Sequence, residues 1–128
     1  MPKILIVEDD SEAREMLAAI LKCAGYGVIT AENGLDALSR ACSEGPALIL
    51  TDLEMPDVGG IEMICRLRSD ETQLGGVPII AMSAYASPLE LAPIVGASES
   101  LLKPFSIQAL LARIEQLLSP ATVQPTAR

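Results

Sequence analysis

The sequence predicts an α/β fold in which helices cover both faces of a doubly wound parallel sheet. Short apolar runs typical of buried strands alternate with stretches of helical periodicity from one end of the chain to the other. Acidic residues follow the first and the third of these runs, at the edge where open α/β sheets bind their ligands. The 128 residues suffice for one domain with a substantial core and are too few for two.

The predicted strands are short and rich in Ile, Leu and Val. The first, Lys3 to Glu8, is apolar on both faces, as expected where helices cover both sides of a sheet. The third runs directly into Asp52, and Pro56 prevents it from continuing as a central strand. After the first strand, the others in chain order are Val28 to Ala31, Ala47 to Thr51, Val77 to Met82 and residues around Leu101-Leu102.

Helical periodicity follows four of the five strands and begins at recognisable start signals. Asp10 and Ser11 can cap the first helix, and Gly25 closes it. The later start signals are Asn33-Gly34, Gly59-Gly60 and Ser106.

The segment after the fourth strand is a weaker helix. Ser87 and Pro88 suit the N-cap and the first helical position. Pro93 then interrupts the pattern after roughly one turn, because proline lacks a backbone donor and clashes with the preceding turn. We therefore expect an irregular or shortened fourth helix.

Charge and composition exclude several classes of function. The net charge is −8, from 17 acidic and 9 basic residues, so direct binding to nucleic acid or to an anionic membrane is not expected. Two Tyr and one Phe leave little for base stacking. The absence of histidine excludes a Ser-His-Asp triad, a histidine-ligated zinc ion and a phosphohistidine carrier within this chain.

The cysteines and the first residues indicate the compartment. Cys23, Cys42 and Cys65 show no C-x-x-C spacing and lie among apolar helical residues, which predicts buried, reduced thiols. The first apolar run is too short for a signal peptide, and no run approaches a membrane span. We expect a cytoplasmic protein.

The periodic part of the chain ends near Leu118, which predicts one domain over residues 1–118. Residues 119–128 have no periodicity and contain two prolines, so they are expected to form a disordered tail or the stub of a linker. Met1 favours a free-standing or amino-terminal domain, whereas such a stub favours a fragment of a larger protein.

Four acids are expected to converge at one edge of the sheet. Glu8, Asp9 and Asp10 follow the first strand and Asp52 follows the third, and these strands are neighbours in the order 2-1-3-4-5. Clustered carboxylates repel one another and stay ionised only around a cation, and oxygen ligands suit Mg²⁺. The alternative is a solvated, helix-capping acidic turn, which the position of Asp52 disfavours.

Two further polar side chains end strands at the same edge. Lys103 is the only basic residue between Arg68 and Arg113, which suggests an ammonium that pairs with a carboxylate or a phosphoryl group. A surface lysine is the alternative. The Lys103-Pro104 bond is a candidate for the cis form. Ser83 can donate to an oxygen held on Asp52, a weak signal alone but a specific one jointly with the acids and the lysine.

The chain resembles the receiver domain of response regulators in two-component signalling (CheY-like) from Lys3 to about Leu118. The motifs that carry the resemblance are Ile6-Val7-Glu8-Asp9, Asp52-Leu53-Glu54-Met55-Pro56, Met82-Ser83-Ala84 and Lys103-Pro104-Phe105. The resemblance implies a flavodoxin-like sheet in the order 2-1-3-4-5 and a phosphorylation-dependent signalling switch that is not an enzyme.

The resemblance also implies a role for each matched residue. Asp52 would accept the phosphoryl group, and Ser83 and Lys103 would contact its oxygens. Glu8, Asp9, Asp52 and the backbone carbonyl of Glu54 would hold Mg²⁺. Because the chain has no histidine, the donor must be a phosphohistidine on a histidine kinase or histidine phosphotransfer protein, or a small phosphodonor.

The sequence departs from the family on the face that typically binds the output partner. Ser100 stands where the family usually carries an aromatic residue, and Pro93 falls within the fourth helix. We therefore expect an unusual output surface, with the partner undefined. Glu54 and Tyr85 lie two residues past the acceptor and the hydroxyl, so they are candidates for setting the lifetime of the phosphorylated state.

Two other readings remain open. One is a receiver-like interaction module that switches atypically or without phosphate, against which the complete set of acids, hydroxyl and lysine argues. The other is an aspartate-nucleophile phosphatase, since Asp52-Leu53-Glu54 has the D-x-D form; the chain leaves little room for a substrate pocket.

Overall fold

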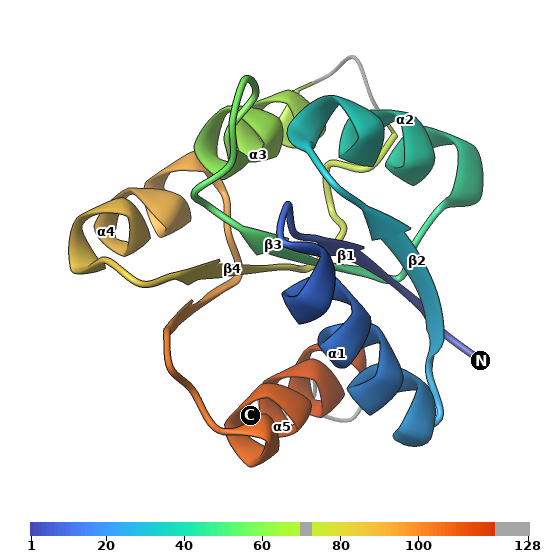
Figure 1. Cartoon of the computed structure of the whole chain (residues 1–128). Coiled ribbons are helices and arrows are strands. Elements are labelled where there is room, and N and C mark those ends of the chain that lie inside the picture. The colour runs from blue at the N-terminus through green and yellow to red at the C-terminus, as the bar shows by residue number, and fades with distance from the viewer. Residues whose placement is uncertain (70–72, 120–128) are drawn as a thin grey trace, which may run out of the picture.

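The computed structural model describes residues 1–69 and 73–119 and contains one parallel sheet (Figure 1). Its strand order is β2-β1-β3-β4-β5, as predicted. All neighbouring strands pair in parallel. The strands are β1 (Lys3–Val7), β2 (Gly27–Ala31), β3 (Leu48–Asp52), β4 (Ile79–Ser83) and β5 (Glu99–Leu102).

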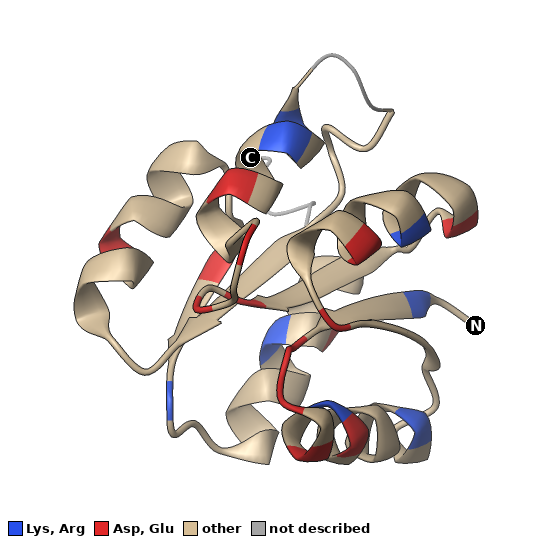
Figure 2. Ribbon diagram, turned by 45° about the horizontal axis from the view of Figure 1, so that its top comes forward, with Lys and Arg blue, Asp and Glu red and all other residues tan. Residues whose placement is uncertain are grey.

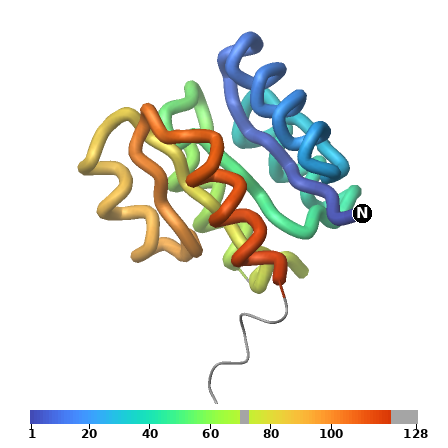
Figure 3. Tube along the Cα trace, turned by 90° about the horizontal axis from the view of Figure 1, so that it is seen from below, coloured from blue at the N-terminus to red at the C-terminus, as the bar shows by residue number. Residues whose placement is uncertain are grey.

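A helix follows every strand, so each parallel connection crosses over one face of the sheet. The helices are α1 (Ser11–Cys23), α2 (Gly34–Glu44), α3 (Gly60–Arg68), α4 (Ala86–Val95) and α5 (Ile107–Leu118). Helices α1 and α5 cover one face, and α2, α3 and α4 cover the other. Figure 3 views the molecule from the side of α1 and α5, with α5 in red and α1 in blue.

The sheet separates two apolar clusters. Leu5 and Val7 of β1 pack toward α2, α3 and α4, whereas Ile4 and Ile6 pack toward α1 and α5. Successive side chains of a strand point to opposite faces, so a sheet covered on both sides needs apolar residues at every position. β3 and β4 are buried along their whole length. Their last residues, Asp52 and Ser83, are therefore polar groups at the rim of the core.

Three of the predicted helix starts are confirmed by hydrogen bonds. Asp10 Oδ2 accepts from the amide of Ala13 at 3.1 Å, and Asn33 Oδ1 accepts from the amide of Asp36 at 2.8 Å. Ser106 Oγ accepts from the amide of Ala109 at 3.0 Å. Each side chain satisfies an amide that has no partner within its helix.

The predicted interruption of the fourth helix is wrong. α4 runs through Pro93 and spans ten residues, and its N-cap is Tyr85 rather than Ser87. Pro93 lies in the last turn, where its missing donor affects one hydrogen bond of the helix. Ala92 beside it is fully buried, and its carbonyl accepts from the amides of Gly96 at 3.1 Å and Ala97 at 2.9 Å. Packing and this C-terminal closure outweigh the local preference of proline.

The cysteines and the chain end complete the comparison. Cys23, Cys42 and Cys65, on α1, α2 and α3, are exposed, so the prediction of buried thiols is wrong. The predicted tail, 119–128, lies outside the described residues except for Ser119. Within the described ranges, no helix combines the length and the apolar character needed to cross a bilayer.

Arg68 ties the end of α3 to two distant segments. Its Nε and Nη2 donate to the carbonyl of Gly96 at 3.0 and 2.8 Å, and its Nη1 donates to the carbonyl of Gly75 at 3.0 Å. Burial lowers the pKa of its guanidinium from the ordinary value. These bonds join α3, the loop before β4 and the residue that ends α4.

Replacing Arg68 with Ala is expected to lower the free energy of unfolding by about 1–3 kcal/mol, because partly buried carbonyls lose a charged donor. Urea unfolding followed by circular dichroism measures the loss. Arg66→Ala is the matched control, since Arg66 makes an exposed pair with Glu62 on the same helix. Such pairs contribute about 0–1 kcal/mol. Equal losses in the two variants would contradict a tying role for Arg68.

Candidate functional site

Three carboxylates meet at the edge where β1 and β3 end. Glu8, Asp9 and Asp52 each offer one oxygen, and these oxygens all lie within 4.8 Å of one another. Figure 2 shows the acidic segments that follow the two strands in red. Glu8 and Asp52 are buried, whereas Asp9 is exposed. Asp10 caps α1 and is not part of this acid cluster.

Lys103 is the cation that meets the acid cluster. Its Nζ lies 3.1 Å from Asp52 Oδ1 and 3.4 Å from Glu8 Oε1. The amide of Lys103 donates to the carbonyl of Ser83 at 2.7 Å, which anchors the residue to the end of β4. The Lys103-Pro104 bond is cis, as the sequence suggested. The alternative of a solvated surface lysine is therefore wrong.

The electrostatics of the site reflect an excess of negative charge. Burial, followed by repulsion from Asp52, raises the pKa of Glu8 to about 7, against the opposing charge of Lys103. Burial also raises the pKa of Asp52, although its hydrogen bond with Lys103 opposes this. Burial alone would lower the pKa of Lys103, but the hydrogen bond and the charge of Asp52 outweigh it and the pKa is raised. One ammonium does not neutralise three carboxylates.

This donor set fits a hard divalent cation. The three groups are carboxylates that converge from two neighbouring strands, and oxygen ligands are those that Mg²⁺ prefers. Burial is the largest cause of the raised pKa of both Glu8 and Asp52, and repulsion from a neighbouring carboxylate adds to it in each case. A contribution from the backbone carbonyl of Glu54 stays a prediction.

Ser83 lies at the same edge, but its hydroxyl has a partner that the sequence analysis missed. Ser83 Oγ donates to Glu54 Oε2 at 2.6 Å and accepts from the amide of Tyr85 at 3.0 Å. The amide of Ala84 donates to Glu54 Oε1 at 3.4 Å. An acid after one strand and a hydroxyl at the end of its neighbour were the available signals for this contact.

The two departures from the resemblance, Ser100 and Pro93, and the lifetime candidate Tyr85 lie outside the acid cluster. Ser100 is a half-buried residue of β5, paired in register with Ala81. Pro93 is exposed on α4, and Tyr85 is 62% exposed. The structure therefore separates them from the acids and the lysine.

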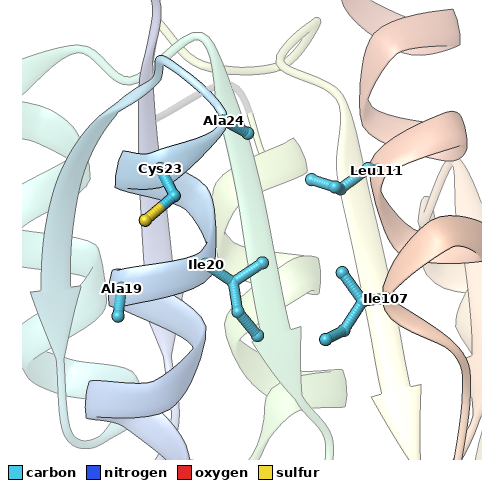
Figure 4. A pocket seen from close by; sticks show the side chains of 6 residues that line it. All are labelled: Ala19, Ile20, Cys23, Ala24, Ile107 and Leu111. Atoms are coloured by element: carbon cyan, nitrogen blue, oxygen red, sulfur yellow. The ribbon is translucent and has the colours of Figure 1, made fainter.

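An apolar groove of about 600 Å³ begins at the acid cluster and runs between α1 and α5. Glu8 and Lys103 line its polar end, and Met16, Phe105 and Ile107 line its apolar part. A second hollow of about 420 Å³ continues between the same helices past Ile20 and Ile107 (Figure 4). Met16 is 60% exposed, so this face offers apolar surface directly beside the carboxylates.

The fold and the acid cluster define a class of protein: a phosphoacceptor signalling module, not a classical enzyme. Residues 4–115 match the family model of the response regulator receiver domain. The chain belongs to this family, whose members act in two-component signalling. The acid cluster is consistent with the phosphoaspartate site of such domains.

Several curated relatives are transcriptional regulatory proteins. The chain is 37% identical over 120 residues to the transcriptional regulatory protein CpxR homolog of Haemophilus influenzae, covering 92% of this chain and 51% of the relative. It is 39% identical over 121 residues to the phosphate regulon transcriptional regulatory protein PhoB of Pseudomonas aeruginosa, covering 90% and 51%. The chain thus spans about half the length of these relatives.

Solved structures of single domains are covered almost completely. The chemotaxis response regulator CheY4 of Vibrio cholerae is 33% identical, with a TM-score of 0.84 over 92% of this chain and 99% of that one. The response regulator protein TrrA of Thermotoga maritima, solved in complex with Mg²⁺-BeF, is 32% identical with a TM-score of 0.84 over 92% and 100%. These similarities extend to the whole of the sheet and its helices.

Proposed function

We propose that this domain is a phosphorylation-dependent switch whose Asp52 accepts a phosphoryl group from the phosphohistidine of a histidine kinase or histidine phosphotransfer protein. The observation that carries the proposal is a buried acceptor carboxylate, Asp52, bonded to Lys103 at 3.1 Å inside a cluster of acids. We place the domain in the cytoplasm, where receiver domains typically act.

The chemistry follows from the neighbours of Asp52. A carboxylate oxygen of Asp52 attacks phosphorus, the bond from phosphorus to the donor nitrogen breaks, and the histidine leaves with the electron pair. Phosphoryl transfer depends on positioning of the reacting groups and on neutralisation of their negative charge more than on covalent assistance. Lys103 supplies one positive charge at the acceptor, and Ser83 supplies a hydroxyl donor. Mg²⁺ held by Glu8, Asp9 and Asp52, with the carbonyl of Glu54, would neutralise further negative charge.

The apolar groove supports a protein donor. Because these 128 residues contain no histidine, the phosphohistidine must lie outside this domain. The groove joins Met16 and Phe105 to Lys103 at the site, so a donor that packs on α1 and α5 reaches Asp52 without crossing the sheet. We therefore propose this face, rather than α2 and α3, as the surface that receives the donor.

Met16→Glu is expected to slow transfer from a histidine phosphotransfer protein about tenfold, because a charge enters an apolar contact. Phosphorylation by a small donor such as acetyl phosphate should change less than about twofold, since Met16 is an exposed residue of α1. Leu35→Glu on α2 is the control, because Leu35 is 56% exposed on the opposite face. Equal slowing with both donors would mean that the substitution distorts the site instead.

The signal after phosphorylation is proposed to pass through the loop between β4 and α4. Ser100 offers no aromatic ring to rotate, but Ser83 contacts the amide of Tyr85, which caps α4. Exposed Leu91 and Ile94 on α4 give an output partner an apolar surface of unusual composition. Tyr85 stays a candidate for tuning the lifetime of the phosphorylated state.

The alternative is an interaction module that does not use phosphate. Titration with beryllofluoride and Mg²⁺, followed by amide chemical shifts, separates the two. Saturable changes that require both reagents and spread from Asp52 to α4 support the switch. A protein that ignores the phosphoryl mimic, yet retains its fold, supports the alternative.

A further inference from the structure

The carboxylate of Glu54 accepts hydrogen bonds from the last residue of β4 and from the first residue after it. One oxygen accepts from the hydroxyl of Ser83 at 2.6 Å, and the other accepts from the amide of Ala84 at 3.4 Å. The two segments are 29 residues apart in the chain, and Ser83 is fully buried. A carboxylate from the loop after β3 therefore bridges to the loop after β4.

The same donors lie where a phosphoryl group on Asp52 would need them. β3 and β4 are neighbours, and Asp52 pairs in register with Met82. Ser83 and Ala84 are thus the first residues of β4 and its loop beyond the acceptor. The hydroxyl of Ser83 and the amide of Ala84 each have one proton to donate. The oxygens of the Glu54 carboxylate and those of a phosphoryl group on Asp52 therefore compete for the same two donors.

We propose that Glu54 is a latch of the unphosphorylated domain, a positioning residue whose carboxylate holds Ser83 and Ala84 until a phosphoryl group on Asp52 displaces it. The inference rests on the proposed function of Asp52. Displacement follows from charge as well as from competition, because the phosphoryl group brings negative charge beside a carboxylate that already repels Asp52. Glu54 then opposes phosphorylation rather than assisting it.

The latch also connects the site to α4. Ser83 Oγ accepts from the amide of Tyr85 at 3.0 Å while it donates to Glu54. Release of Glu54 frees the hydroxyl of Ser83 to turn toward Asp52. This rotation changes the hydrogen bond that the hydroxyl accepts from the amide of Tyr85, the residue that caps α4. The device needs no aromatic ring at Ser100.

The first test compares affinities for beryllofluoride in the presence of Mg²⁺. Glu54→Ala is expected to bind the mimic about tenfold more tightly than the parent, because a charge-assisted bond is lost only from the free state. Glu62→Gln removes one negative charge from the exposed surface of α3 and serves as the control. Its affinity should change less than about twofold, since exposed distant charges are screened. Unchanged affinity in Glu54→Ala would overturn the latch.

A double-mutant cycle separates the latch from simple repulsion. If Glu54 acts through the hydroxyl, its removal in a Ser83→Ala background should improve affinity by less than about threefold. If Glu54 only repels the incoming charge, the tenfold gain should persist without the hydroxyl. Persistence of the full gain in the Ser83→Ala background would overturn the latch.

A second readout records the variant itself without metal or mimic and uses the beryllofluoride-bound parent as the reference. In metal-free Glu54→Ala, the amide resonances of Ala84 and Tyr85 should move toward their positions in the beryllofluoride-bound parent. Unchanged amides, in a background where the parent still binds the mimic at Asp52, would reject the latch and leave the proposed function standing. A parent that does not bind the mimic at all would reject both.

Discussion

Asp52→Asn is expected to lower the rate of phosphorylation by acetyl phosphate in the presence of Mg²⁺ by at least about two orders of magnitude. The amide offers no carboxylate oxygen to attack phosphorus, so the aspartyl phosphate cannot form. Intact-mass spectra should show one added phosphoryl group on the parent and none on the variant. Peptide mapping of the parent should place the group on Asp52.

Two controls show whether the loss of phosphorylation in Asp52→Asn is due to the missing acceptor. Glu62→Gln, on the exposed surface of α3, should be phosphorylated like the parent. Asp52→Asn should also fold at least as stably as the parent, because it removes a buried anion from a site with excess negative charge. Phosphate on another residue of the parent, or undiminished phosphorylation of the variant, would refute Asp52 as the acceptor.

Lys103→Ala is expected to destabilise the metal-free domain by about 2–4 kcal/mol near pH 8. Among residues 1–69 and 73–119, Lys103 is the one cation paired with the buried carboxylates of Asp52 and Glu8, and loss of one partner of a buried pair is costly. The side chain of Lys103 is 33% exposed, which places the loss below the full range for buried pairs. Urea unfolding at fixed ionic strength measures it.

The loss of stability in Lys103→Ala should be smaller at lower pH, because Glu8 becomes protonated there. Its pKa of about 7 in the folded domain lies above the ordinary 4.5, so between these values the folded state binds a proton that the unfolded chain has released. The stability of the parent should therefore fall as pH rises from about 5 to 7. A protonated Glu8 no longer needs Lys103, so Lys103→Ala should cost least near pH 5. A cost independent of pH would contradict this pairing.

The site could be anticipated from the sequence because its positions depend on strand ends. Glu8, Asp52, Ser83 and Lys103 each end or follow a strand, and the parallel order brings these ends to one edge. Strand periodicity and the alternation of elements carry that information over the whole chain. The acid cluster and the lysine contact follow from topology alone.

What could not be anticipated depends on packing between elements. Pro93 was expected to break the fourth helix. The burial of Ala92 and the hydrogen bonds from Gly96 and Ala97 to its carbonyl stabilise the helix past Pro93 instead. The cysteines are exposed although their neighbours in sequence are apolar. The bond between Glu54 and Ser83 depends on side-chain directions in two loops, which no periodic pattern records.

The sheet places its two apolar layers on opposite sides, with the groove of α1 and α5 on one and the exposed residues of α4 on the other. A phosphodonor and a downstream protein could then be engaged at the same time, with no need for one to leave first. The rate of signalling through the domain would then be limited by the lifetime of the phosphorylated Asp52, not by competition between the phosphodonor and the downstream protein.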